Sequence, residues 1–505
     1  MPVLTMAVDL GTSFIKAGVY NTDGKCFGIV KEPVKAETPS AGIFLQKGEK
    51  IYRSTLLCMK KAAEMIKNPA DIEAVSFVGQ MAGFMGVGAG WEDITGWSCS
   101  LDTRYIPYAE RQQKEFFEDF MNISGTNSPL FSSKYEWFRS EFPQQAAKIQ
   151  KYMMLNGYII GKLGNLPVEE AVIDVSLLTW TGLADVKNGT WSKNICSKLG
   201  ISEKYLPRVV QPYEVVSHLS EAAAAFCSLR SGIPLVAGAG DKIAGCVGSN
   251  ILAPGKMIFE DASFGGLSFC TETYRTDQEK HHFDMLCGLG KGKYYAHYYI
   301  PGSGITSEWF VDQFTVGKSG TGKQAFDEMN REMAQIQPGC DGLMAIGMLA
   351  GSVMPFNGDL KGVWMGFDWS HRPAHFYRAL VESHAYALAT AMEQMEKVYP
   401  EYPAQTLYAI GGGARTVERL QLFADVCGKT IKTADREDAA LLGASLLAEK
   451  GTGMIEDLSE TSQKNIHTDM VIEPDMEKNE KYQKYKVQYN QYCKEMTHLC
   501  KGLIR

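Results

Sequence analysis

One aspartate has the setting of a proton acceptor. Asp241 follows an apolar run at 234–237 and a turn that Gly238 and Gly240 permit, and a helical pattern follows it at 243–247. A carboxylate at such a strand-to-helix turn lies at the positive end of the helix dipole, which favours its ionised form. It could accept a proton from a bound hydroxyl group, although the same pattern also fits an ordinary N-cap aspartate. The motif alone leaves both interpretations open.

The motif Asp9-Leu-Gly-Thr-Ser13 could bind polyphosphate. Gly11, Thr12 and Ser13 offer backbone N–H groups in a turn, and Lys16 adds a cation nearby. Asp9 could hold a hydrated Mg²⁺ ion beside those phosphates. A plain hairpin uses the same small residues, so this interpretation needs support from the rest of the chain.

The motif Gly411-Gly-Gly-Ala-Arg415 has the composition of a nucleotide-binding turn. It follows a strand pattern at 407–410, and its glycines leave room for a flat ring to lie against the backbone. Backbone amides at the start of a following helix could also reach an α-phosphate. An ordinary turn between a strand and a helix is the structural alternative.

Two other loops combine polar side chains with an aromatic ring, as polyol sites do. Gly79-Gln-Met-Ala-Gly83 ends a strand at 72–78, where α/β sheets commonly carry ligand contacts. Asp102 and Arg104 follow Trp97 closely. A hydroxyl-rich ligand suits this combination, while a surface ion pair explains Asp102 and Arg104 equally well.

The elements that must position these loops repeat a pattern. Strands at 4–10 and 14–20 flank the first glycine turn, and strands at 256–261 and 267–271 flank a second turn, Ala262-Ser-Phe-Gly-Gly266. The repeat predicts two halves that face each other across a cleft, each with a phosphate loop. Long helices are expected at 376–398 and 439–448. Residues 456–481 are polar enough for a linker or a loosely held loop, and tail tyrosines at 3-4-3 spacing predict a packing stripe.

Composition narrows the class of protein. A chain of 505 residues is long enough for two domains of roughly 200–250 residues each. A net charge of −7 argues against nucleic acid or an acidic membrane as the main partner. Twelve cysteines, scattered singly, fit reduced thiols in a cytoplasmic protein better than a disulfide frame or a zinc site. Neither a long apolar run nor a signal-peptide pattern occurs, so we expect no secretion and no membrane span.

Taken in order, these stretches resemble the FGGY carbohydrate kinases, and most closely their xylulokinase-like branch. The resemblance runs from about residue 5 to about residue 450. The matching pieces, in the family's order, are Asp9-Leu-Gly-Thr-Ser13, Gly79-Gln-Met-Ala-Gly83, Asp102-Thr-Arg104, Gly238-Ala-Gly-Asp-Lys-Ile-Ala-Gly245, Lys361-Gly-Val-Trp-Met-Gly366, Arg378-Ala-Leu-Val-Glu382, Gly411-Gly-Gly-Ala-Arg415 and residues 439–447.

The resemblance implies an α/β fold with two actin-like (ribonuclease H-like) domains and a cleft between them. It predicts an N-terminal domain at 1–250 with the sugar side, the first phosphate loop and the catalytic aspartate. A C-terminal domain at 251–455 would hold the adenosine side, and a helical extension would follow at 456–505. The domains would close over ATP, Mg²⁺ and a sugar, and Asp241 would deprotonate the accepting hydroxyl group. Such a reaction depends mainly on positioning and charge neutralisation.

By the same resemblance, the expected site residues fall into groups by ligand. Asp9 would meet the metal. The phosphate contacts would be Gly11, Thr12, Ser13, Lys16, Ser263, Gly265 and Gly266, and the adenosine contacts would be Gly412, Gly413, Ala414 and Arg415. The sugar contacts would be Gln80, Met81, Ala82, Asp102, Arg104 and Lys242.

Three departures from the xylulokinase pattern bear on the substrate. Ala82 stands where a histidine is usual, Lys242 stands where an asparagine is usual, and Phe264 interrupts the usual Gly-Thr-Ser of the second phosphate loop. We expect a small sugar or polyol as the acceptor, with another ketopentose, a tetritol or a sugar acid such as gluconate as alternatives. Lys242 could favour an acid, or could be the ion-pair partner of Asp241.

Two other classes of protein have a similar architecture. A non-catalytic sugar sensor would need a DNA-binding segment, which we do not expect in this acidic chain. An actin-like ATPase would hydrolyse ATP without any sugar. A homodimer is one assembly compatible with these patterns.

Overall fold

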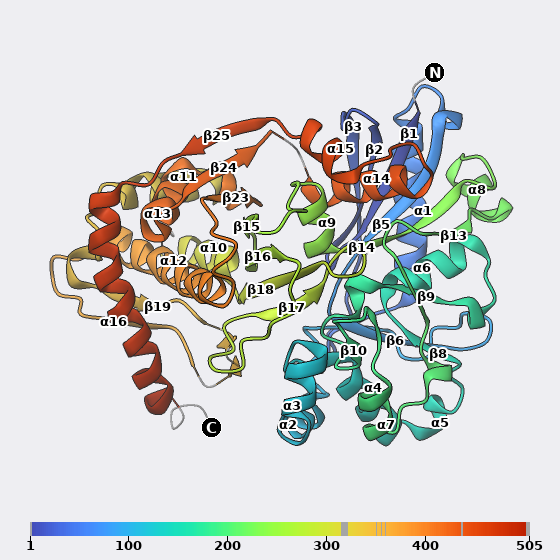
Figure 1. Cartoon of the computed structure of the whole chain (residues 1–505), viewed down its shortest axis with the longest axis horizontal. Coiled ribbons are helices and arrows are strands. Elements are labelled where there is room, and N and C mark those ends of the chain that lie inside the picture. The colour runs from blue at the N-terminus through green and yellow to red at the C-terminus, as the bar shows by residue number, and fades with distance from the viewer. Residues whose placement is uncertain are drawn as a thin grey trace.

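Two mixed β-sheets, one in each half of the chain, organise the fold (Figure 1). The computed structural model describes residues 3–314, 322–349, 351–354, 356–358, 360–435 and 438–500. The two halves form α/β domains that lie side by side, with α9 and α14 between them. The expected α/β class and two-domain architecture are confirmed.

The first sheet has the strand order β13-β14-β5-β1-β2-β3. Strand β1 runs antiparallel to β2 and parallel to β5, and β5 runs parallel to β14. Almost every residue of β1 is buried, because helices cover both faces of a central strand in such a sheet. The strands are β1 (Leu4–Leu10), β2 (Phe14–Asn21), β3 (Cys26–Pro33), β5 (Ile72–Gly79), β13 (Val215–His218) and β14 (Pro234–Gly240).

The second sheet repeats this arrangement in the order β17-β18-β16-β15-β23-β24-β25. Strand β15 runs antiparallel to β16 and parallel to β23, and β23 runs parallel to β24. The repeat expected from the glycine turns is therefore confirmed. The strands are β15 (Met257–Glu260), β16 (Gly265–Thr271), β17 (Asp284–Cys287), β18 (Tyr294–Ile300), β23 (Thr406–Ile410), β24 (Thr430–Ala434) and β25 (Thr468–Ile472).

Helices cover the sheets and link the domains. Helices α1, α6 and α14 pack against the first sheet, and α12 packs against the second. The helices are α1 (Gly48–Glu64), α2 (Ile106–Glu115), α3 (Phe117–Asp119), α4 (Leu130–Glu141), α5 (Pro143–Ala146), α6 (Leu155–Gly164), α7 (Lys193–Lys198), α8 (Glu221–Cys227), α9 (Asp241–Val247), α10 (Ser303–Phe314), α11 (Gly322–Ala334), α12 (Pro373–Val398), α13 (Val417–Cys427), α14 (Ala439–Gly451), α15 (Leu458–Lys464) and α16 (Met476–Cys500).

Short strands form small sheets beside the two main ones. One of them, in the order β4-β7-β6-β8, carries the loops expected to face the sugar. The short strands are β4 (Leu45–Gln46), β6 (Gly83–Val87), β7 (Trp97–Cys99), β8 (Lys151–Met153), β9 (Val172–Asp174), β10 (Ala184–Asp185), β11 (Thr190–Trp191), β12 (Arg208–Val210), β19 (Met344–Ile346), β20 (Ser352–Val353), β21 (Phe356–Asn357) and β22 (Val363–Met365).

Helices α9 and α14 cross with their backbones in contact. A β-carbon on Gly248 would lie 1.9 Å from the carbonyl oxygen of Ala439, and one on Gly443 would lie 1.9 Å from the carbonyl oxygen of Ala244. Glycine is therefore required at both positions, because any side chain would collide with backbone. The crossing fixes the two helices against each other at the boundary of the domains.

Helix α14 belongs to the second half of the chain but packs on the first sheet. It contacts β1, β5 and β14, and the hydroxyl groups of Thr5 and Ser445 are hydrogen-bonded at 2.7 Å. Most residues of α14 are buried, as expected of a helix that is apolar all round. The helix that packs on the first sheet is therefore made more than 400 residues after its first strand.

The segment at 456–481 is ordered, so its interpretation as a linker or loose loop is wrong. It forms α15, the edge strand β25 and the start of α16. Strand β25 pairs antiparallel with β24, and its alternation of exposed and half-buried residues explains the polar composition. The expected tyrosine stripe is partly confirmed, because Tyr482 and Tyr489 of α16 are buried.

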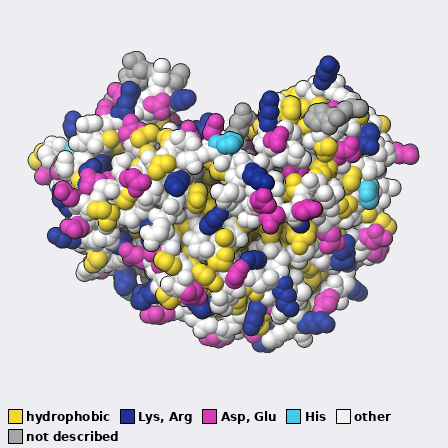
Figure 2. All heavy atoms as spheres, turned by 45° about the horizontal axis from the view of Figure 1, so that its top comes forward, with side chains coloured by type: hydrophobic (Ala, Val, Ile, Leu, Met, Phe, Trp, Pro, Cys, Tyr) yellow, Lys and Arg dark blue, Asp and Glu magenta, His cyan; other side chains and the backbone are white. Residues whose placement is uncertain are grey.

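The surface mixes charges of both signs. On the face drawn in Figure 2, Lys and Arg side chains are interspersed with Asp and Glu side chains. Among the described helices, none is both long and apolar enough to cross a membrane.

A buried carboxyl group on α14 makes stability depend on pH. Glu449 is 1% exposed, its Oε1 accepts a hydrogen bond from Ser445 (3.1 Å), and its Oε2 has no partner among the described residues. Burial raises the pKa of Glu449 from 4.5 to about 8. The stabilising contribution of the protonated carboxyl is therefore present below about pH 4.5 and is lost as the pH rises toward 8.

We expect Glu449→Gln to remove this pH dependence. The amide stays neutral, so the free energy of unfolding of the variant should differ little from that of the unsubstituted protein at pH 5 and should be higher at pH 8. Urea denaturation at pH 5, 6.5 and 8 measures the difference. A difference that stays constant between pH 5 and pH 8 would contradict the assignment.

Candidate active site

A cavity of about 820 Å³ lies where the two domains meet. Residues from β1, β2, α9, β15, β16, β23 and α14 contribute to its wall. The residues predicted for the site that line it are Asp9, Gly11, Thr12, Lys16, Gln80, Asp241, Lys242, Gly266, Gly412, Ala414 and Arg415. Residues predicted from separate motifs therefore share one cavity.

Asp241 is the first residue of α9, directly after β14. Gly238 has a φ of +75°, and a β-carbon there would lie 1.8 Å from the carbonyl oxygen of Phe77, so only glycine fits this turn. The Asp241 side chain is 45% exposed, and its Oδ1 accepts a hydrogen bond from the Lys242 amide (2.9 Å). The carboxylate lies at the start of the helix and remains open to the cavity. Asp241 can therefore act as a proton acceptor.

A buried hydroxyl group holds the turn that carries Asp241. The backbone N–H of Gly240 donates to Ser176 Oγ (2.8 Å), and the same hydroxyl group donates to the carboxylate of Asp174. Both side chains are almost fully buried. Because the chain Asp174–Ser176–Gly240 ends one residue before Asp241, it restricts where that carboxylate lies.

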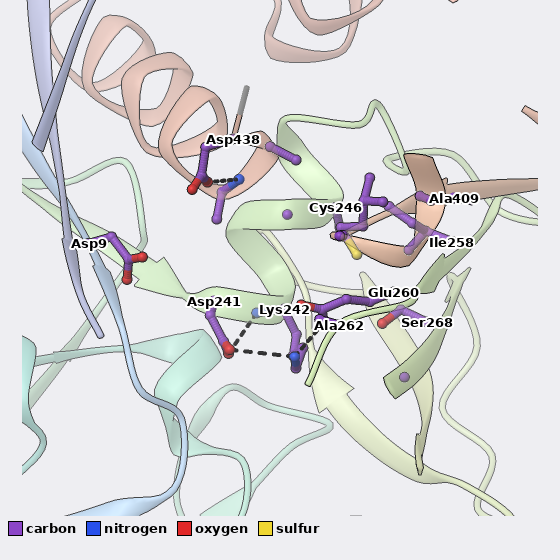
Figure 3. A pocket seen from close by; sticks show the side chains of 18 of the residues that line it. Asp9, Asp241, Lys242, Cys246, Ile258, Glu260, Ala262, Ser268, Ala409 and Asp438 are labelled. Carbon is purple, nitrogen blue, oxygen red and sulfur yellow. Dashed lines mark hydrogen bonds and ion pairs between the residues drawn. The ribbon is translucent and has the colours of Figure 1, made fainter. Parts of the chain in front are cut away.

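Lys242 is not a free cation. Its ammonium group lies 3.5 Å from Asp241 Oδ2 and donates a hydrogen bond to Glu260, the last residue of β15 (Figure 3). The Lys242 side chain is 13% exposed. Burial disfavours its charge, but the two carboxylates outweigh this effect and raise the pKa of Lys242. The lysine therefore links Asp241 of one domain to a glutamate of the other.

A second charged cluster lies beside the first glycine turn. Lys16 Nζ lies 3.1 Å from Asp9 Oδ2 and 2.9 Å from Asp438 Oδ2. Asp438 also caps α14, where its Oδ1 accepts from the amides of Ala440 and Leu441 (3.1 Å each). Burial raises the pKa of Asp9 to about 6, although Lys16 opposes the shift. Carboxylates from both halves of the chain thus contact one lysine. The lysine could contact phosphates, and the two carboxylates could contact a metal ion.

The two central glycines of the Gly411–Arg415 turn face different surroundings. A β-carbon on Gly412 would meet no atom within 4 Å, whereas one on Gly413 would lie 1.9 Å from Asp261 Oδ2. Gly412 and Gly413 also line a second cavity of about 560 Å³, together with Ser263, Gly304 and residues of α10 and α11. The surface of Gly412 is therefore the one open to a ligand, while Gly413 makes room for Asp261.

Comparisons with known proteins decide the family. The model of the FGGY family of carbohydrate kinases, N-terminal domain, matches residues 4–248, and the model of the C-terminal domain matches residues 269–450. The chain belongs to the FGGY family of carbohydrate kinases. It is therefore a phosphotransferase with an alcohol group as acceptor, and the resemblance stated from the sequence is confirmed.

The relatives of this FGGY kinase include enzymes named for different sugars. It is 25% identical to the xylulose kinase of Bacillus subtilis (strain 168) over 498 residues, which cover 98% of this chain and 96% of that protein. It is 26% identical to the gluconokinase of the same organism over 475 residues, which cover 90% of this chain and 89% of that protein. The structure of ligand-bound xylulose kinase from Lactobacillus acidophilus aligns with a TM-score of 0.90 at 20% identity over 98% of both chains, which supports the fold.

On the sugar side, the predicted residues of this FGGY kinase are distributed unevenly. Gln80 lines the central cavity, but its amide is occupied: Nε2 donates to Leu10 O (3.1 Å), and Oε1 accepts from Thr12 (3.1 Å) and Trp97 (3.3 Å). Met81 is buried against Gly240. Within the described structure, the predicted residues that border neither cavity are Ser13, Met81, Ala82, Asp102, Arg104 and Gly265.

Asp102 and Arg104 form a closed pair. Arg104 donates to both carboxylate oxygens of Asp102, at 2.9 and 2.6 Å, and its guanidinium group lies 4.5 Å from the ring centroid of Trp137. Asp102 is 1% exposed and also accepts from Ser98 (3.0 Å). Asp102 therefore neutralises the positive charge of Arg104 before any ligand binds.

Sequence reasoning missed Glu260 and Asp438, which complete both charged clusters. Glu260 ends a strand in the other half of the chain, where the sequence offers no sign that it meets Lys242. Asp438 was detectable in principle, because it directly precedes the apolar helix at 439–448 and has the residue type of an N-cap. Ser263 and Gly413, which were predicted, line only the second cavity.

Proposed function

We propose that this FGGY kinase transfers the terminal phosphoryl group of ATP to a hydroxyl group of a small sugar or polyol, with Asp241 as the general base. The observation that carries the proposal is the position of Asp241, half-exposed at the start of α9 and facing a cavity with loops from both domains on its wall. The acceptor oxygen forms a bond to phosphorus, its proton moves to the Asp241 carboxylate, and ADP leaves.

The nucleotide would lie along the glycine turns. Gly11, Thr12 and Lys16 would contact the terminal phosphates, and the open surface of Gly412 would receive the adenosine. Ser263 would provide a hydroxyl group from the second loop. The next residue, Phe264, has no hydroxyl group, and its ring stacks on Tyr299 with the ring centroids 6.0 Å apart.

Asp9 and Asp438 would hold Mg²⁺. Among the described residues, no group of three or more His, Cys, Asp or Glu side chains could hold a metal ion by itself. Magnesium fits this arrangement, because it commonly takes one or two carboxylates and completes its shell with water and phosphate oxygens. When bound, it would neutralise phosphate charge. Lys16 now holds the same two carboxylates together and would orient toward the phosphates.

The names of the relatives leave two kinds of acceptor as candidates. Xylulose kinases and gluconokinases are similar to this chain over nearly its whole length, so a neutral ketose and a sugar acid are both candidates. All twelve cysteines lie within the described residues and none of them forms a disulfide there, which supports the cytoplasm as the location.

An ADP-release assay against ketoses, polyols and aldonates tests the proposal. We expect ATP turnover that depends on one or a few of these compounds and on Mg²⁺. Turnover that is equally fast without any sugar would reject the proposal and favour an actin-like ATPase.

The Gly412 surface offers a second test. Gly412 has φ −64° and ψ −40°, which a valine can adopt, so Gly412→Val should fold normally and fill the expected adenosine site. We expect ATP affinity to fall by about tenfold or more, with sugar affinity unchanged in the nucleotide-free protein. Calorimetric titration measures both affinities. Unchanged ATP binding would place the adenosine elsewhere.

A further inference from the structure

The charges around Asp241 do not match a negatively charged acceptor. Asp241, Lys242 and Glu260 lie together at the wall of the central cavity and carry one positive and two negative charges (Figure 3). Lys242 contacts both carboxylates and is largely buried, so its one positive charge faces two negative charges. A sugar carboxylate placed here would meet a net negative charge of one.

Other cations near the cavity are also occupied or lie toward the nucleotide. Arg104 is paired with Asp102 through two hydrogen bonds. Among the described residues that line the cavity, the remaining cations are Lys16, Lys31 and Arg415. Lys16 is held by Asp9 and Asp438, and Lys31 is the cross-strand neighbour of Lys16 on β3, on the side expected to hold the phosphates. Arg415 ends the glycine turn expected to hold adenosine.

His297, the one histidine among the described residues of the wall, adds no charge. His297 of β18 is fully buried, and its Nδ1 shares a hydrogen bond of 2.9 Å with Ser268 Oγ. Burial, assisted by the nearby Lys242 charge, lowers the pKa of His297 to about 3, so the ring is neutral at physiological pH. It can offer a hydrogen bond to a neutral group but no attraction to an anion.

We propose that the acceptor of this kinase is an uncharged sugar or polyol, and that Glu260 excludes sugar acids by sharing Lys242 with Asp241. This inference rests on the proposed sugar phosphorylation. An unbalanced negative charge in a partly buried cavity disfavours an anion while leaving a hydroxyl-rich neutral ligand unaffected. Specificity of this kind comes from an unfavourable contact with the wrong ligand, rather than from a stronger contact with the right one.

The test compares neutral and acidic acceptors of equal carbon number in three proteins. The unsubstituted enzyme, Glu260→Gln and Glu272→Gln are assayed with five- and six-carbon ketoses, polyols and aldonates. Glu260→Gln keeps the size of the side chain and removes one negative charge beside Lys242. Glu272→Gln makes the same change in an exposed pair with Lys293, away from the cavity, and serves as the matched control.

We expect the unsubstituted enzyme to have a kcat/KM for its best neutral acceptor that exceeds the value for any aldonate by about tenfold or more. Glu260→Gln should narrow that ratio by about tenfold, and Glu272→Gln should leave it unchanged. Added salt should lower the aldonate KM of the unsubstituted enzyme and not that of Glu260→Gln, because salt screens the repulsion.

A preference of the unsubstituted enzyme for an aldonate would overturn the inference while leaving the proposed kinase function standing. An unchanged ratio in folded Glu260→Gln, verified by nucleotide titration, would overturn it as well. Absence of turnover with every compound would instead overturn the proposed function, and the inference with it.

Discussion

Replacing Asp241 by asparagine should lower sugar phosphorylation by about 10²–10⁴-fold, the usual contribution of a positioned general base. The amide has nearly the same size and can still accept the hydrogen bond from the Lys242 amide, so the start of α9 should keep its geometry. It cannot accept the proton of the acceptor hydroxyl group. Nucleotide binding should remain, because the expected ATP contacts lie on other loops.

Steady-state kinetics with the best acceptor, together with calorimetric titration of ATP, measures both halves of this prediction. Asp23→Asn, in the exposed β2–β3 hairpin, is the matched control and should retain normal turnover. Turnover near the normal rate in folded Asp241→Asn would remove Asp241 from the mechanism.

Replacing Arg419 by methionine should destabilise the second domain by about 3–5 kcal/mol, the cost of leaving a buried charge without its partner. Arg419 of α13 donates to both oxygens of Asp261, at 2.9 and 3.0 Å, and both side chains are 1% exposed. Asp261 also supports the glycine turn, because its carbonyl oxygen accepts from the amide of Gly413 (2.8 Å). ATP affinity should therefore fall together with stability.

Urea denaturation of Arg419→Met, Asp261→Asn and the double variant tests this prediction. The double variant leaves no unpaired charge, so it should recover part of the stability that Arg419→Met loses. Arg230→Met breaks an exposed pair with Glu73 and should have a much smaller effect. Equal stability of Arg419→Met and the unsubstituted protein would show that the buried pair contributes nothing net.

The sequence predicted those parts of the site that depend on local chain geometry. An apolar run at 234–237, two glycines and a helical pattern at 243–247 predicted the strand-to-helix turn at Asp241. In the structure the strand extends to Gly240 and the helix begins at Asp241. The glycine turn at 411–415 was equally visible. Local patterns of this kind survive folding because each satisfies its own backbone requirements.

The sequence could not predict the contacts that join distant segments. Lys242 was placed beside Asp241, but its hydrogen bond to Glu260 depends on how the two domains meet. The glycine turn gave no reason to separate Gly412 from Gly413, because the difference is made by Asp261 of another strand. Strand β25 was missed because an edge strand with solvent on its outer side needs little apolar sequence.

The crossing of α9 and α14 has a consequence for the order in which the protein can fold during synthesis. Strand β1 is made first, yet the helix that packs on it, with Ser445 against Thr5, is made near the end. Until α14 has been synthesised, the apolar face of the first sheet that it covers stays exposed to solvent. Neither half is therefore an independent folding unit, and fragments divided near residue 250 should recover a native structure only when they are refolded together.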